Sequence, residues 1–496
     1  LKMSETYERQ TKSLTGLKTF PHPPIPFDDP ERPTDYFERF SLLTNMVVWN
    51  VGVFDETLDI DRLQAVLDHI IVRYPVLSIQ CYRNAETEPH IKLRPGPGIS
   101  ANVAQDLRDN PTLTSDAELE AFVDTIRPRV TYDRLAGFVM LPIQPGPDFA
   151  VADGCKYALV LYGNHMVLDG TSSFFLFHEI DRLLGEGVLE AEPTSVRQRA
   201  PFSPYSYVTD DMEPISMIPF DEDFDHMLGD HRPSYEAPMP DPADRVVRHL
   251  VRRVPIAAFK RPDGISNSDF MAAASTAMAG MDMLFGKNKD IRRAGHSADE
   301  PLNLRVGMPT LNNQTFMDMR PERGSPAELL GNKIITGFMA IPGVTKDTTF
   351  EEIGRCIAMQ RQKIRAGDER DQHRGMFFRV LKGLMAKPVM VDVPTTLVRI
   401  SSIMTNVGAV VPFKGALKEV FGIAAMQTCG LVLIAPSCVR GHDSAMVVMA
   451  YTDPSFNRES AERMLNHWLR VMDVIRERGP KVTLTQLYEA VGDSPE

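Results

Sequence analysis

The sequence predicts a mixed α/β protein, of the α/β or α+β class, in two halves that each combine strands and helices. Three observations support this. Short apolar runs bounded by turn residues alternate along the chain with segments of helical periodicity, and no internal repeat occurs. The 496 residues exceed the roughly 250–300 at which a single core stops growing. A proline-rich, acidic stretch separates the two halves.

The first half begins with a helix and a strand. Residues 58–81 carry apolar side chains at helical spacing and then a β-rich run after Pro75. Residues 114–126 show a helix start, with Ser115 as N-cap and acidic residues in the first turn. The run YALVLYG, residues 157–163, is typical of a strand buried on both faces.

The second half restarts with a strand and alternates strands with helices to its end. Helices are predicted at residues 268–284, 350–365 and 460–475, and strands or apolar runs at 245–254, 302–310, 329–342, 395–404, 431–436 and 445–453. We therefore predict an N-terminal lobe over residues 1–190, a proline-rich crossover or linker over 191–245, and a C-terminal lobe over 246–496. An ordered lid is the alternative for the crossover.

Charge and cysteine content exclude several classes of protein. The formal net charge of -12 gives no general attraction to phosphate backbones, so we expect no nucleic-acid partner. The five cysteines lack CxxC spacing, so neither a disulfide framework nor a metal site is predicted. The polar N-terminal residues lack the apolar segment of a signal peptide, and no apolar run is long enough for a membrane span. We expect a cytoplasmic monomer, and peripheral membrane contact stays open.

One short motif carries the candidate chemistry. His165, Asp169 and Gly170 form H-x-x-x-D-G directly after the predicted strand at residues 157–163. Such a strand brings its last side chain to the end of a sheet, where loops present it to a cleft. A neutral imidazole there can take a proton from a hydroxyl or amine that attacks an acyl carbon. We predict His165 to be a general base; the alternative is a structural histidine at a strand end.

The residues around His165 are expected to support the turn. Gly170 is expected to adopt a backbone conformation closed to residues with a Cβ, and Asp169 to fix the turn by bonding backbone or a basic side chain. Thr171 or Ser172 is expected to cap the helix that follows. Asn164 is interpreted as a bystander.

The segment NHMVLDG, residues 164–170, resembles the H-H-x-x-x-D-G signature of the condensation-domain superfamily, which includes the chloramphenicol acetyltransferase-like acyltransferases. Four further stretches resemble the superfamily in the expected order. Three are similar to the wax ester synthase/diacylglycerol acyltransferase branch, and the last of these also to the alcohol acetyltransferases. The four stretches are residues 58–81, 265–279, 329–342 and 402–413.

The chain departs from the family pattern at several points. Asn164 replaces the first histidine of the signature, and Asn267 is displaced by one position from the N-D pair that Asp269 completes. The segment TNVGAV lacks the P-G-P of the wax ester branch, and the D-F-G-W-G of plant-type acyltransferases is absent from the sequence.

The resemblance implies two chloramphenicol acetyltransferase-like lobes that form a pseudo-dimer with a tunnel between them and His165 near its middle. Acyl-CoA or an acyl carrier protein thioester would enter as co-substrate, with no permanently bound cofactor, and a small-molecule or lipid acceptor would enter opposite. His165 would deprotonate the acceptor, while the Gly170 N–H, Thr405 or Asn406 would hold the oxyanion. Asp269 is carried over as a substrate-binding candidate.

Three functions stay open. The first is an acyl-CoA-dependent O-acyltransferase, in lipid or secondary metabolism, that forms an ester or else an amide. The second is a stand-alone condensation-type enzyme that uses a carrier-bound acyl group. The third is a non-catalytic lipid or metabolite binder, which Asn164 and the displaced Asn267 would suit. The basic cluster at residues 287–293 fits either the phosphates of coenzyme A or a solvated helix end.

Overall fold

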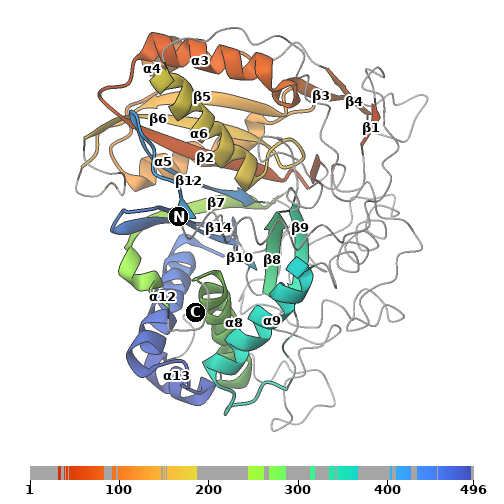
Figure 1. The fold of residues 1–496 in the computed structure, drawn as a ribbon, viewed down its shortest axis with the longest axis vertical. Helices are drawn as coiled ribbons and strands as arrows, with labels where there is room; N and C mark the ends of the chain where they lie inside the picture. Colours follow the sequence, from red (N-terminus) through yellow and green to blue (C-terminus); the bar gives the residue numbers. More distant parts are fainter. Residues whose placement is uncertain are drawn as a thin grey trace.

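The computed structural model shows two lobes, each with a β-sheet that helices cover (Figure 1). It describes residues 32–34, 38, 41–42, 44–82, 92–95, 99–146, 149, 151, 154–186, 244–261, 267–285, 313–318, 334–339, 341, 343–366, 403–404, 409–425, 433–454 and 456–492.

The sheet of the upper lobe in Figure 1 has four antiparallel strands in the order β12, β2, β6, β5. These are β12 (Leu417–Ala425), β2 (Val47–Asp55), β6 (Cys155–Asn164) and β5 (Ala136–Pro142). β2 is buried along all but its last residue and β6 along all but its first few positions. Burial on both faces explains why both strands read as nearly continuous apolar runs.

Helices α3 (Ile60–Arg73) and α6 (Gly170–Glu186) pack on this sheet and on each other, and α4 (Val103–Asp109) packs against β5. Helix α5 (Asp116–Asp124) instead packs against β7 of the lower sheet. The α6 side chain of Phe177 lies so close to Gly52 of β2 that a Cβ at Gly52 would overlap its ring. The absence of a side chain at this position therefore lets α6 approach the sheet.

The lower lobe is built on a seven-stranded sheet in the order β7, β14, β13, β10, β8, β9, with β11 pairing with β13. The strands are β7 (Val246–Pro255), β14 (Ser444–Asp453), β13 (Leu433–Val439), β10 (Ile403–Met404), β8 (Asn313–Asp318), β9 (Ile334–Met339) and β11 (Ala409–Val410). β10 runs parallel to both β13 and β8.

In the described part of this lobe, four helices surround the core: α8 (Asn267–Phe285), α9 (Phe350–Ala366), α12 (Arg458–Arg478) and α13 (Leu484–Val491). Their buried side chains include Phe270, Phe350 and Trp468. Of the helices in the described ranges, none combines the length and apolar composition that a bilayer crossing requires.

Short elements complete the described chain. A three-stranded sheet joins β1 (Arg32–Pro33), β4 (Lys92–Pro95) and β3 (Ile79–Tyr82), and single 3-10 turns lie at Pro75–Ser78, Arg127–Arg129 and Ile256–Phe259.

Strand β12 crosses between the halves of the sequence. It comes from the second half, yet it pairs with β2 in the upper sheet, with Ala425 opposite Val47 and Leu417 opposite Phe54. The upper sheet therefore contains segments that lie more than half the chain apart. The division at residues 190 and 246 stays a prediction, because nearly all of the crossover region lies outside the described residues.

The predicted mixed α/β class is confirmed, and so are several elements. The expected helices correspond to α3, α5, α6, α8, α9 and α12, and Ser115 caps α5 by accepting a hydrogen bond from the N–H of Glu118. The helices α4 and α13 and the strands β1, β2, β4, β5, β8, β11 and β12 were not predicted. The strand expected at residues 302–310 lies outside the described residues. At the end of α6 it is Leu183 that faces the core, because its side chain is buried whereas that of Leu184 is only half-buried.

The contact between Gly52 and Phe177 predicts opposite effects of one added methyl group at two glycines. Gly52→Ala is expected to lower the free energy of unfolding by about 1–3 kcal/mol, because the new Cβ overlaps the Phe177 ring. Gly185→Ala, exposed on α6 with open space around it, is the control and is expected to gain about 0.5–1 kcal/mol. Urea denaturation measures both, and Phe177→Leu should restore part of the loss in Gly52→Ala.

Candidate active site

His165 lies immediately after β6, at the end of the upper sheet where Val47 of β2 pairs with Asn164. Its backbone N–H donates to the carbonyl of Met46 at 2.8 Å, and the residue is only 3% exposed. β6 therefore brings the histidine to the sheet end as predicted, and the residue before β2 holds its backbone.

Asn164 fixes both sides of this turn, a structural role that its interpretation as a bystander in the chemistry did not include. Its backbone N–H donates to the carbonyl of Leu135 at 2.7 Å, and its side-chain Nδ2 donates to the carbonyl of Ser41 at 3.2 Å. Its Oδ1 accepts the N–H of Met166 at 3.1 Å. A buried amide with both a donor and an acceptor can satisfy these backbone groups at once.

Asp169 joins the turn to α6. Its Oδ1 accepts the N–H of Ser172 at 2.7 Å, and its carbonyl accepts the N–H and the hydroxyl of Ser173, each at 3.0 Å. Asp169 therefore occupies the N-cap position, and the expected capping by Thr171 or Ser172 is wrong. A buried carboxylate at this end of the helix also interacts favourably with the helix dipole.

Gly170 is the first residue of α6 and is not among the described glycines with positive φ. The expected special backbone conformation is therefore wrong. Its position has another consequence, because the first amide groups of a helix have no partner within the helix and point away from its N-terminus. The Gly170 N–H stays a candidate oxyanion donor on this ground.

The surroundings of His165 keep its imidazole neutral. Burial lowers the pKa of His165 below the ordinary value of 6.5, while the Asp169 carboxylate and a hydrogen bond between the ring and the residue's own backbone act in the opposite direction. Because Nδ1 is bonded to Cγ, it is the ring nitrogen of a histidine that can reach the residue's own backbone, and we infer that it is the donor. In the neutral ring Nε2 then carries the lone pair that can receive a proton.

The remaining candidates lie elsewhere. Asp269 is near the start of α8 in the lower lobe, buried, with its Oδ2 2.6 Å from the guanidinium of Arg361 on α9. This ion pair joins two helices, and a role of Asp269 in substrate binding stays a prediction. Thr405 and Asn406 lie outside the described residues, as does the basic cluster at residues 287–293.

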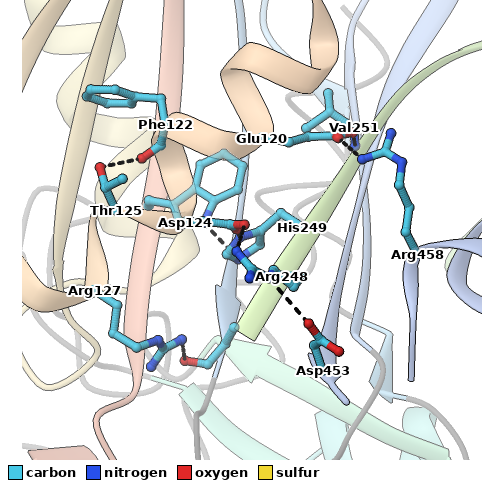
Figure 2. Close-up of polar contacts among 12 residues, drawn as sticks. Glu120, Phe122, Asp124, Thr125, Arg127, Arg248, His249, Val251, Asp453 and Arg458 are labelled. Carbon is cyan, nitrogen blue, oxygen red and sulfur yellow. Dashed lines mark hydrogen bonds and ion pairs between the residues drawn. The ribbon is translucent and has the colours of Figure 1, made fainter. Parts of the chain in front are cut away.

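A second buried polar group, which the sequence did not predict, lies where α5 meets β7 (Figure 2). His249 of β7 places its Nδ1 2.8 Å from Asp124, and Asp124 also pairs with Arg248 at 3.1 Å. Glu120 accepts the N–H of Val251 at 2.8 Å. The sequence signal was a histidine on the same face of the strand as Val251, at a position where an apolar residue is usual.

This polar group borders a pocket of about 460 Å³ between α5, β7, β14 and the start of α12. Arg458 of α12 reaches across to Glu120, and Arg248 pairs with Asp453 as well as with Asp124. Burial raises the pKa of Glu120, while Arg458 acts in the opposite direction. The charged side chains of this pocket therefore serve the contact between α5 and the lower lobe.

No protein-family model and no curated protein sequence matches the chain. Solved structures match it in fold. The starter condensation domain of rhizomide synthetase RzmA, a double mutant in complex with C8-CoA and Leu-SNAC, aligns with a TM-score of 0.57 at 11% identity, over 94% of this chain and 98% of that chain. The condensation domain of the monacolin K polyketide synthase MokA aligns with a TM-score of 0.56 at 11% identity, over 92% of this chain and 99% of that chain. The chain thus has the fold of these condensation domains.

Proposed function

We propose that the chain is an acyltransferase that moves an acyl group from a thioester to a hydroxyl or amine, with His165 as general base. The observation that carries this proposal is the buried imidazole at the end of β6, held by Met46, Asn164 and the Asp169 turn, where burial lowers its pKa and favours the neutral form. The condensation-domain fold supports it, because a shared fold makes this reaction class a natural candidate while the site decides the chemistry.

In this reaction Nε2 of His165 accepts the proton of the acceptor hydroxyl or amine as that atom attacks the thioester carbonyl. The carbonyl π electrons move to oxygen, and the tetrahedral oxyanion is stabilised by backbone donors, for which the Gly170 N–H is our candidate, with Thr405 and Asn406 as further ones. Collapse expels the thiolate, which takes the proton back from the imidazolium. The ester or amide and a free thiol leave, and His165 is neutral again.

Asp169 supports the base without exchanging a proton in this scheme. Its carboxylate raises the pKa of His165 and so stabilises the imidazolium that forms after proton transfer. Its hydrogen bonds to Ser172 and Ser173 hold the carboxylate in place at the start of α6. Burial thus lowers the pKa of His165 and the carboxylate raises it. Burial favours the neutral ring before the reaction, and the carboxylate stabilises the imidazolium that forms during it.

For the donor we propose acyl-CoA, because the similar RzmA domain forms a complex with C8-CoA. A carrier-bound acyl group is the alternative. The acceptor is proposed to be a small molecule or a lipid in lipid or secondary metabolism, and the protein is proposed to act as a cytoplasmic monomer. A role of Asp269 in binding substrate belongs to the same proposal.

Replacement of His165 tests the base assignment. His165→Ala is expected to lower the transfer rate by about 10²–10⁴-fold, because no group then accepts the acceptor proton. The control is His178→Gln, which changes a half-buried histidine on α6 whose ring contacts Phe413 at a tilt of 33° and which is expected to keep the rate. Rates are measured by product mass spectrometry over a panel of alcohols and amines. Unchanged transfer by a folded His165→Ala protein would show that His165 is not the base.

The lowered pKa of His165 predicts a loss of stability in mild acid. The unfolded chain binds a proton near pH 6.5, whereas the folded protein binds it only at lower pH. The free energy of unfolding should therefore fall as the pH drops below about 6.5, with this histidine contributing at most about 1.4 kcal/mol per pH unit. Urea unfolding at about pH 7.5 and about pH 5.5 is expected to show a smaller loss in His165→Gln than in wild type. An equal loss in both proteins would contradict the shift.

The donor is tested by competition between two thioesters. Incubation with a mixed acyl-CoA pool, followed by native mass spectrometry, is expected to show acyl transfer and release of free coenzyme A. A strict need for a phosphopantetheinylated carrier protein would instead favour the condensation-type alternative. Binding without turnover that is unaffected by the loss of His165 would favour the non-catalytic binder.

A further inference from the structure

The short segment at residues 45–49, which enters β2, receives contacts from both lobes. The carbonyl of Met46 in this segment holds the backbone N–H of His165 at 2.8 Å. On one side of Met46, the carbonyl of Asn45 accepts a hydrogen bond from the guanidinium of Arg127. On the other side, the indole N–H of Trp49 donates to Nε2 of His249 in the lower lobe at 3.1 Å. The backbone that holds His165 is therefore bounded by two side-chain contacts.

Arg127 joins the entry of β2 to the end of β12. Its second guanidinium nitrogen donates to the carbonyl of Ala425 at 3.1 Å, and Ala425 lies opposite Val47 in the sheet. The residue is partly exposed, but protein atoms surround its guanidinium, and this burial lowers the pKa of Arg127 to about 10. A buried guanidinium charge is costly unless its N–H groups are hydrogen-bonded. Arg127 therefore holds the carbonyls of Asn45 and Ala425 at a fixed distance from each other.

The second contact is a chain of three side chains, of which Figure 2 labels Asp124 and His249. Because the Trp49 N–H needs an acceptor, Nε2 of His249 carries no proton, and Nδ1–H donates to Asp124. The Trp49 and His249 rings meet edge to face, with centroids 5.1 Å apart. Asp124 of α5 thus fixes the tautomer of His249 on β7, and that tautomer supplies the lone pair that accepts the indole N–H of Trp49 on β2.

We propose that Asp124, His249 and Arg127 are positioning residues for the transfer reaction: through segment 45–49 they hold His165 in its reactive orientation only while β7 of the lower lobe is docked against Trp49. This inference rests on the proposed function of His165. It makes the contact between the lobes a condition for fast transfer, because a shift of the Met46 carbonyl moves the backbone of the base. A misplacement of about 1 Å in such a group can cost about 10²-fold in rate.

A different interlobe contact provides the matched control. Arg253 of β7 pairs with Glu419 of β12, and Glu419 lies opposite Val53, toward the far end of β2 from His165. Glu419→Gln weakens this contact but leaves segment 45–49 untouched. It separates a specific effect on His165 from a general loosening of the lobes.

The experiment compares His249→Leu with His249→Gln, whose amide oxygen and N–H can replace the two ring nitrogens. His249→Leu is expected to lower kcat by about 10–100-fold with little change in KM, and His249→Gln to recover most of the rate. His249→Leu leaves the buried indole N–H of Trp49 without an acceptor, which can destabilise the protein. Trp49→Phe is therefore a second variant, which breaks the same contact by removing the donor. Glu419→Gln is expected to keep wild-type kcat.

A readout that needs no turnover accompanies the rates. The chain has two tryptophans, so the indole N–H resonance of Trp49 is assigned with Trp49→Phe, and the ring resonances of His165 with His165→Gln. His249→Leu is expected to move both sets of resonances, whereas Glu419→Gln should move neither. If the Trp49 resonance moves while those of His165 stay unchanged, the positioning role is overturned even if acyl transfer has not been observed. Absence of transfer by wild type, with the resonances coupled as expected, would count against the proposed function alone.

Discussion

The enclosure of β2 is the constraint on which the rest of the structure depends. Its two edges pair with β6 and β12, and its two faces are covered by different lobes. Gly52 on one face admits Phe177 of α6, and Trp49 on the other face meets His249 of β7. A slip by one residue would exchange these two faces and destroy both contacts. The register of β2 is therefore strongly specified. Because the Met46 carbonyl accepts the N–H of His165, the position of β2 also determines where the backbone of His165 lies.

The contact between the lobes is polar at several buried points. Glu120 with Arg458 and Glu419 with Arg253 form ion pairs, and neutral His249 donates a hydrogen bond to Asp124; all three contacts join segments that are distant in sequence. Charged pairs of this kind add little net stability, because desolvation offsets their attraction. Their geometric demands are strict, however, since a misplaced partner leaves a buried charge unpaired. We infer that these contacts act together to select one relative orientation of the lobes, so that the loss of the Glu419 pair alone leaves the orientation in place, while the apolar cores stabilise each lobe separately.

The two buried histidines His165 and His249 have different roles because they lie in different surroundings. Burial lowers the pKa of both His165 and His249, so both are neutral at physiological pH. The lone pair of His249 accepts the indole N–H of Trp49 in the folded protein, and protonation would set two donors against each other. His165 instead follows the strand end, beside a carboxylate that can stabilise its charged form. The same residue type thus serves the contact between lobes in one place and, in our proposal, proton transfer in the other.

The local sequence determined the mixed α/β class, the helices α3, α5 and α6, the strand β6 and the placement of the H-x-x-x-D-G motif at its end. These follow from periodicity, capping residues and apolar runs, which depend on neighbours a few positions away. Tertiary structure alone decided that β12 would pair with β2, that Asn164 would bond both sides of the turn, and that Asp124 and His249 would meet Trp49. These partners lie tens to hundreds of residues apart, and their meeting depends on how the two sheets pack, which no local pattern encodes.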